Sequence, residues 1–207
     1  MQTKQTYFPT LENVKAAAKN LEGVAYKTPL NINTNLSKQL GATIFFKRED
    51  LQVVRSYKIR GAYNKMSSLN ADEKQRGIVC ASAGNHAQGV ALSCKLLQIK
   101  GTIFMPSPTP NQKINQVKMF GEDFIEIVIG GDTFDDAFNA AKEECDSKNK
   151  TFIHPFNDEK VIEGQATVGL EILNQTKEKI DYVFVPIGGG GLSAGLSSVF
   201  KYVSPET

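Results

Sequence analysis

Apolar residues in this chain of 207 residues follow two alternating patterns. Short continuous apolar runs, typical of buried strands, alternate with segments in which apolar residues recur every three or four positions, as on one face of a helix. The expected strands are residues 43–47, 77–81, 102–105, 124–129, 151–153 and 182–186. Strands that alternate with helices and are apolar on both faces predict an α/β fold with a parallel sheet and flanking helices.

The expected helices begin near residues that favour helix starts. Thr10 and Thr109 are expected to cap helices, with Pro110 at the first position of the second one and Gly121 at its end. Further helices are expected after Ser56, after the 77–81 strand, from Asp132 or Thr133, from about Asp158 to Gln175, and after the glycine run near the carboxyl end.

Composition and charge exclude several classes of function. The chain is 41% hydrophobic and 22% charged with a net charge of +2, as expected for a soluble globular protein without a nucleic-acid-binding stripe. No apolar run approaches the ~18 residues of a membrane helix, so no membrane partner is expected. Cys80, Cys94 and Cys145 are far apart and form no CxxC pair, which favours a cytoplasmic location. His86 and His154 are the two histidines, so no metal site is expected.

A lysine at a predicted helix start is the first candidate for chemistry. Lys58 follows Ser56, a potential cap, in the run SYKIRGA. Free N–H groups in the first helical turn disfavour a cation, and burial acts in the same direction. A neutral amine is what Schiff-base formation requires. From spacing alone, however, a solvated surface lysine is the more common outcome.

A strand-to-helix loop is the second candidate. The run SAGNHAQG contains Ser82, Gly84, Asn85 and His86 between an expected strand and an expected helix. Loops at the carboxyl ends of parallel strands commonly bind ligands, and free N–H groups at a helix start favour a carboxylate. An ordinary loop with Asn85 as a cap is an equally good interpretation of this segment, and His86 alone is more often structural.

Four consecutive glycines form the third candidate. Gly188, Gly189, Gly190 and Gly191, followed by Leu192, lie between an expected strand and an expected helix. Glycine backbone approaches a phosphate closely, and the helix start favours the anion. A flexible hinge is the weaker alternative because ordering four glycines costs chain entropy. The run also fits a relaxed dinucleotide-binding pattern, but that pattern is weak on its own.

The three segments together resemble the signature segments of fold-type II pyridoxal-phosphate enzymes, with the tryptophan synthase β-like architecture. The nearest resemblance is to the threonine dehydratases, also called threonine deaminases, and it includes the stretch FIHPFNDEKVIEGQATVGLEIL. Gln52 to Ser56 are more similar to the biosynthetic branch than to the catabolic one. The resemblance implies dehydration and deamination of L-threonine to 2-oxobutanoate and ammonia, for isoleucine synthesis.

The resemblance also implies a role for each segment. Lys58 is expected to hold pyridoxal 5'-phosphate as a Schiff base and to move the α-proton of the substrate. Asn85 is expected to bind the oxygen on the cofactor ring, and Gly188–Gly191 with Leu192 to bind its phosphate. Ser82, Gly84 and His86 are expected in the loop that closes on the substrate carboxylate.

The family's organisation implies a small α/β domain at 54–156. Residues 1–53 and 157–207 are expected to form a large domain. We expect that domain to be truncated, because family members continue well past the glycine run. We therefore expect a homo-oligomer, dimer or tetramer, for the complete enzyme, and weak cofactor binding with little or no turnover for this chain. A serine dehydratase or racemase-like enzyme, threonine synthase, or a catalytically inactive truncated domain remain alternatives, with a nucleotide-binding domain as a more distant one.

Overall fold

The computed structural model describes residues 7–207, so residues 1–6 of the predicted 1–53 segment lie outside the described part. The strands are β1 (Leu30–Ile32), β2 (Phe45–Lys47), β3 (Ile78–Ala81), β4 (Gly101–Met105), β5 (Ile125–Ile129) and β6 (Thr151–Phe152). The helices are α1 (Leu11–Asn20), α2 (Thr34–Leu40), α3 (Lys58–Ser67), α4 (Ala71–Arg76), α5 (Asn85–Leu97), α6 (Asn111–Gly121), α7 (Phe134–Ser147), α8 (Glu159–Gln175) and α9 (Gly191–Val203). The short 3-10 turns are Glu49–Leu51 and Glu122–Phe124.

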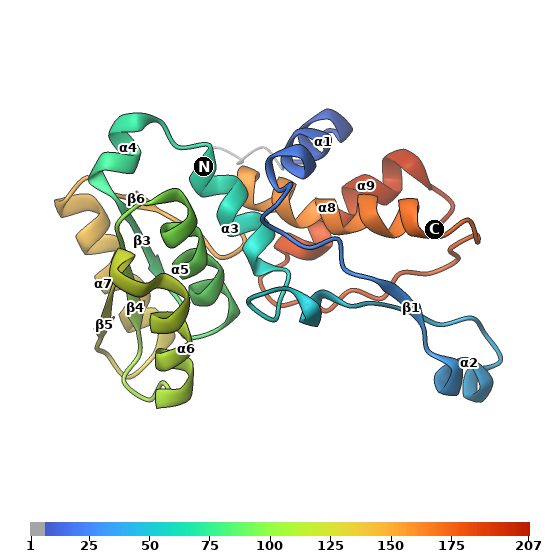
Figure 1. Ribbon diagram of the computed structural model, residues 1–207, viewed down its shortest axis with the longest axis horizontal. Helices are drawn as coiled ribbons and strands as arrows, with labels where there is room; N and C mark the ends of the chain where they lie inside the picture. Colours follow the sequence, from blue (N-terminus) through green and yellow to red (C-terminus); the bar gives the residue numbers. More distant parts are fainter. Residues whose placement is uncertain (1–6) are drawn as a thin grey trace, which may run out of the picture.

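One half of the molecule is a four-stranded parallel sheet in the order β5-β4-β3-β6 (Figure 1). β3 and β4 are buried along their whole length, which explains their continuous apolar sequences. Helices α3, α5 and α6 cover one face, and α7 covers the other. The predicted α/β class with a parallel sheet and flanking helices is confirmed.

The other half is mainly helical, and α3 lies between the two halves (Figure 1). Helix α8 packs against α9, α1 and α3 around a core that includes Val168, Leu196 and Val199. Close approach of α8 to α3 depends on Gly164, because a Cβ there would lie 2.5 Å from the carbonyl oxygen of Arg60. The start of α3 is thus fixed on both sides, by the sheet half and by α8.

Side-chain caps define several helix starts as expected. Thr10 caps α1 by accepting from the Asn13 N–H, and Asp158 caps α8. Thr133 forms a capping box with Asp136 at the start of α7. At α6, however, the prediction was wrong: Pro110 is the N-cap, and the Thr109 hydroxyl donates to the Pro106 carbonyl at 2.6 Å instead.

Three local features differ from the expected pattern. β2 pairs with β1 in a two-stranded antiparallel sheet rather than joining a parallel sheet. The expected cap Ser56 does not cap α3: its hydroxyl is buried without a hydrogen-bond partner in the described residues, and Tyr57 is the N-cap residue. The short helices α2 and α4 were not expected, although Asn33 and Asn70 cap them.

The strand expected at 182–186 is absent, which makes that prediction wrong. Val183 and Val185 pack against the core of α8 and α9, while Phe184 on the opposite side is 92% exposed. The alternation of side chains is that of an extended segment. Strand formation also needs a neighbouring strand to complete the backbone hydrogen bonds, and none pairs with this segment among residues 7–207.

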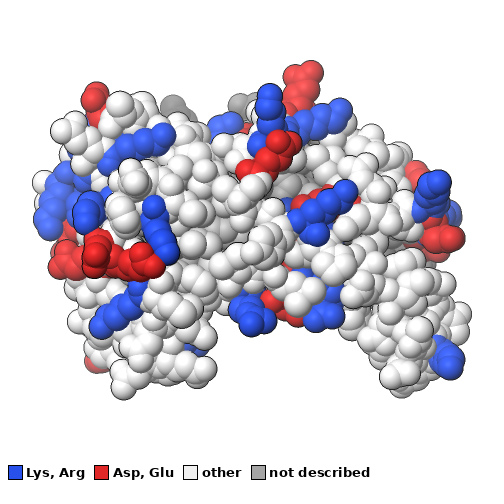
Figure 2. All heavy atoms as spheres, in the orientation of Figure 1, with Lys and Arg blue, Asp and Glu red and all other residues white. Residues whose placement is uncertain are grey.

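The surface carries both signs of charge. Figure 2 shows lysines and arginines interspersed with acidic side chains on the face in view, without a continuous basic stripe. Within residues 7–207, none of the helices has the length and apolar character needed to cross a membrane.

Candidate functional site

The sheet has a topological switch point between β3 and β6. From β3 the chain proceeds to β4 and β5 on one side, and it then returns through α7 to β6 on the other side of β3. In open parallel sheets, ligands bind beyond the carboxyl ends of the two strands at such a point. The segments that follow these strands are residues 82–84 and residues 153–157, and both contain residues of the sequence motifs.

Lys58 extends from the start of α3 to the segment after β6. Its Nζ donates to the carbonyl oxygen of Pro155 at 2.6 Å, in the segment after β6. Burial lowers the pKa of the Lys58 amine. As the first residue of α3, Lys58 also lies in the field of the free N–H groups there, which disfavours a cation. Lys58 is therefore not the solvated surface lysine that spacing alone would favour. Its amine is partly buried and has a lowered pKa.

The SAGNHAQG segment joins the same site through α5. A Cβ on Gly89 would lie 3.0 Å from the backbone carbon of Lys58, so the two helices touch at this glycine. Asn85, exposed in the first turn of α5, lies four residues before Gly89 and thus on the same helix face. Gly84 is the N-cap residue, and the Gly84 N–H donates to the Ser82 hydroxyl at 3.2 Å. Asn85 is not the cap.

The four glycines reach the site through Phe156. A Cβ on Gly189 would lie 2.1 Å from the Phe156 ring, and one on Gly191 would lie 2.8 Å from the Phe156 carbonyl oxygen. Gly190 has a φ of 86°, a conformation that side chains other than glycine rarely adopt. Gly188 and Gly190 have open space where a Cβ would be. The run leads directly into α9, so its N–H groups lie at a helix start, as an anion site requires.

These observations fit pyridoxal phosphate, the cofactor expected from the motifs. The amine of Lys58 is partly buried and of lowered basicity, as an imine-forming lysine needs to be. The glycines at the start of α9 leave space on one side for a phosphate, and no lysine or arginine is required for it there. Among residues 7–207 there is no cluster of three or more His, Cys, Asp or Glu side chains that could hold a metal ion.

Residues 153–157, which we call the bridge segment, connect all three motifs, and the sequence analysis assigned them no role. The Pro155 carbonyl accepts a hydrogen bond from the Lys58 amine, and Phe156 contacts the glycines. The Ile153 carbonyl oxygen lies 2.9 Å from His86 Nε2. These contacts use mainly backbone carbonyls, which leave no trace in the sequence. The available signal was its position, directly after an expected strand end in a parallel sheet.

His86 is buried rather than facing an open loop. Its ring is 3% exposed, and burial lowers its pKa to about 3. The neutral ring donates from Nε2 to the Ile153 carbonyl, while Nδ1 has no hydrogen-bond partner in the described part of the chain. His86 can therefore act on a ligand by fixing the backbone at Ile153, to which its ring is hydrogen-bonded.

We expect His86 to make the folded protein less stable below pH 6.5. In the unfolded chain a histidine titrates near its usual pKa of about 6.5, whereas the folded state resists protonation down to about pH 3. Below pH 6.5 the unfolded state thus binds a proton that the folded state does not, and stability falls with pH. At pH 5.5 the loss is about 1.4 kcal/mol.

Urea unfolding at pH 7.5 and pH 5.5 measures this loss. His86→Gln is the matched control, because glutamine can keep the donor to Ile153 but does not titrate. The wild-type protein should lose about 1.4 kcal/mol more than this variant between the two pH values. Equal losses in the two proteins would contradict the buried neutral state of His86.

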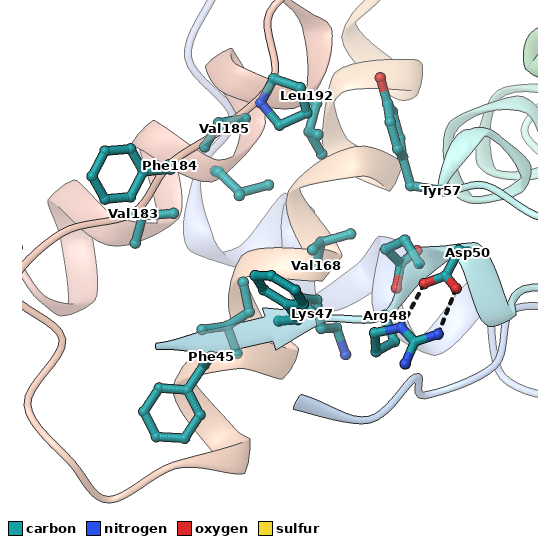
Figure 3. Close-up of a pocket in the computed structure, with 15 residues that line it drawn as sticks. Phe45, Lys47, Arg48, Asp50, Tyr57, Val168, Val183, Phe184, Val185 and Leu192 are labelled. Carbon is teal, nitrogen blue, oxygen red and sulfur yellow. Dashed lines mark hydrogen bonds and ion pairs between the residues drawn. The ribbon is translucent and has the colours of Figure 1, made fainter. Parts of the chain in front are cut away.

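A separate hollow of about 370 Å³ lies between β2 and the extended 183–186 segment (Figure 3). Phe45, Val168 and Val185 contribute to its mainly apolar wall, and the Arg48–Asp50 ion pair lies at its edge. Leu192 is the one predicted site residue among those that line it. The candidate site therefore lies at the switch point, where the Lys58 amine and the segments after β3 and β6 come together.

Comparisons with known proteins show what this chain is similar to. Residues 21–207 match the family model described as pyridoxal-phosphate dependent enzyme. A biosynthetic L-threonine dehydratase from Halalkalibacterium halodurans is 52% identical over 197 residues, which cover 95% of this chain and 48% of the relative. The chain thus spans about half the length of the curated relatives it matches.

Solved structures show the same architecture. The processed form of threonine deaminase isoform 2 from Solanum lycopersicum superposes with a TM-score of 0.88 at 40% identity, covering 100% of this chain and 57% of that one. Maize serine racemase superposes with a TM-score of 0.91 at 32% identity, covering 97% and 60%. The fold therefore occurs in relatives that differ in their reaction.

Proposed function

This chain belongs to the pyridoxal-phosphate-dependent enzyme family, and from that premise we propose that it is part of an enzyme that converts L-threonine into 2-oxobutanoate and ammonia. The observation that carries the cofactor chemistry is the partly buried Lys58 amine at the point where the three motifs meet. The 52% identity to a biosynthetic L-threonine dehydratase supports threonine as the substrate and isoleucine synthesis as the pathway.

Each motif contributes one function to the proposed site. Lys58 would hold the cofactor and would take the α-proton of the substrate, for which its lowered pKa favours the neutral amine. Asn85, exposed in the first turn of α5, would donate to the oxygen of the cofactor ring. The N–H groups of Gly188–Gly191 and Leu192 bind the phosphate at the start of α9. Bound pyridoxal phosphate supplies the conjugated ring that takes up charge when the Cα–H bond breaks.

The loop after β3 is proposed to grip the substrate carboxylate. Ser82 and Gly84 precede α5, where N–H groups at the helix start favour an anion. His86 follows this loop in the first turn of α5 and holds it through its buried ring, which donates to the Ile153 carbonyl. Loss of the β-hydroxyl of threonine as water and hydrolysis of the resulting enamine then give 2-oxobutanoate and ammonia.

Three further properties stay predictions. We propose that 54–156 form the small domain and that 1–53 and 157–207 form part of a large one, with α3 at the contact between them. A cytoplasmic location and a homo-oligomeric state, dimer or tetramer, of the whole enzyme follow from the proposed family role.

Substrate preference separates the proposed reaction from its alternatives. We expect the complete enzyme supplied with pyridoxal phosphate to form more 2-oxobutanoate from threonine than pyruvate from serine, and no product from O-phosphohomoserine. The ketoacids are measured by coupled reduction. A preference for serine, or racemised serine without ketoacid, would assign a serine dehydratase or racemase-like role, since the fold is shared with maize serine racemase. Cofactor bound at Lys58 without any product would indicate a catalytically inactive domain.

A further inference from the structure

We propose that His86 and His154 are positioning residues, which fix the bridge segment (Ile153–Asn157) so that its Pro155 carbonyl meets the Lys58 amine. This inference rests on the proposed function only in taking Lys58 as the cofactor lysine. His86 reaches the segment from α5 and His154 lies within it, and the two histidines use different ring nitrogens.

His154 fixes the segment from within. Its Nδ1 accepts the N–H of Asn157 at 2.8 Å and that of Phe156 at 3.2 Å, which closes a turn after Pro155. The ring also stands edge to face with the Phe156 ring, with centroids 4.6 Å apart at 90°. The turn therefore directs the Pro155 carbonyl towards Lys58 and places Phe156 against the glycines.

His86 fixes the segment from α5. Its neutral ring donates from Nε2 to the Ile153 carbonyl, two residues before Pro155. Because His86 is buried in the helix that touches the Lys58 backbone at Gly89, it ties the bridge segment to the same surface as α3. The lysine and the carbonyl that receives it are thus held by one continuous set of contacts.

The bridge segment also couples the lysine to the glycine run. Phe156 lies so close to Gly189 and Gly191 that neither position has room for a Cβ. A shift of Pro155 would therefore move Phe156 and, through it, the start of α9. The bridge segment therefore contacts both ends of the proposed cofactor site: Pro155 contacts the Lys58 amine, and Phe156 contacts the glycines of the phosphate cradle.

Crossed amide substitutions test the proposal, because each amide replaces one ring nitrogen. Asparagine places its side-chain oxygen near the position of Nδ1, and glutamine places its terminal group near Nε2. His154→Asn and His86→Gln should therefore keep the contact, whereas His154→Gln and His86→Asn should lose it. Two readouts are measured for each variant: borohydride-fixed pyridoxal phosphate on Lys58, and the pH profile of Lys58 acetylation without cofactor, with exposed Lys201 as the internal reference.

We expect His154→Gln and His86→Asn to lower cofactor fixation about five- to tenfold, as for loss of one buried hydrogen bond. The midpoint of Lys58 acetylation should also move to higher pH, because burial no longer lowers its pKa to the same extent. His154→Asn and His86→Gln should stay close to wild type in both. Equal behaviour of the asparagine and glutamine variants at both positions would overturn the proposal.

Two complications are separable in this design. If His86→Asn does not fold, the His154 pair decides, because that ring is only half-buried. If wild-type protein fixes no cofactor at Lys58, the proposed function fails, while the acetylation profiles still decide whether the histidines position the amine.

Discussion

Replacing Lys58 by alanine in the complete enzyme is expected to abolish the yellow absorbance of bound pyridoxal phosphate and all borohydride fixation of the cofactor to the protein. The reason is that Lys58 is the amine at the switch point whose burial lowers its pKa, and it lies where the three motifs meet. Any turnover of threonine should disappear with it, because the same amine is proposed to take the α-proton. Visible spectra and peptide mapping after reduction measure the result.

Lys65→Ala is the matched control for this experiment. Lys65 lies two turns further along α3 and forms a partly exposed ion pair with Asp158 at 2.9 Å. Its loss should cost at most about 1 kcal/mol of stability and leave cofactor fixation unchanged. Undiminished fixation in Lys58→Ala, with the label on another lysine, would exclude Lys58 as the cofactor lysine.

The sequence predicted the parallel sheet well because each of its strands carries its own signal. β3 and β4 are continuous apolar runs. Thr133 and Asp158 are cap-forming residues at the starts of the helices that follow β5 and β6. β2 lies within the strand expected at 43–47, but β1 has three residues, is partly exposed and shows no buried apolar run, so its antiparallel pairing with β2 was missed. The 182–186 segment has strand composition, but pairing depends on a neighbour that composition does not reveal.

The candidate site was predicted in its parts rather than in its connection. Lys58, Asn85 and the glycine run were identified as motifs, and the structure connects the segments that carry them through direct contacts. Their connection through Pro155 and Phe156 depends on a backbone carbonyl and on the close approach of a ring to glycine. Neither contact has a characteristic residue pattern, so the sequence alone could not show it.

A buried ion cluster next to the site was also not predicted. Arg60, 1% exposed and two residues after Lys58, makes paired hydrogen bonds to Glu49 and to Glu171 at 2.7–3.0 Å. Lys47 forms an ion pair with Glu171 as well. Burial acts to lower the pKa of the Arg60 guanidinium, but the hydrogen bonds from the two carboxylates outweigh it and raise that pKa. The cluster joins α3, α8 and the 47–49 segment.

We expect Arg60→Met to lower the free energy of unfolding by about 3 kcal/mol, because it removes the buried cation shared by the partly buried Glu49 and Glu171 carboxylates and leaves only Lys47 paired with Glu171. Arg60→Lys should recover only part of the loss, since an ammonium cannot pair with two carboxylates in the forked geometry of a guanidinium. Urea unfolding at pH 7.5 gives these values.

Arg48→Met provides the comparison that isolates burial from charge. Arg48 also forms a two-bonded pair with a carboxylate, Asp50, at 2.8–2.9 Å, but the two side chains are 37% and 59% exposed. Water solvates both groups when the pair is broken, so the variant should lose much less stability than Arg60→Met. If Arg60→Met cost as little as Arg48→Met, the cluster would not hold α3 in place. Since α3 begins at Lys58, a large difference between the two variants would show that the lysine of the proposed site stands on a helix anchored by buried charge.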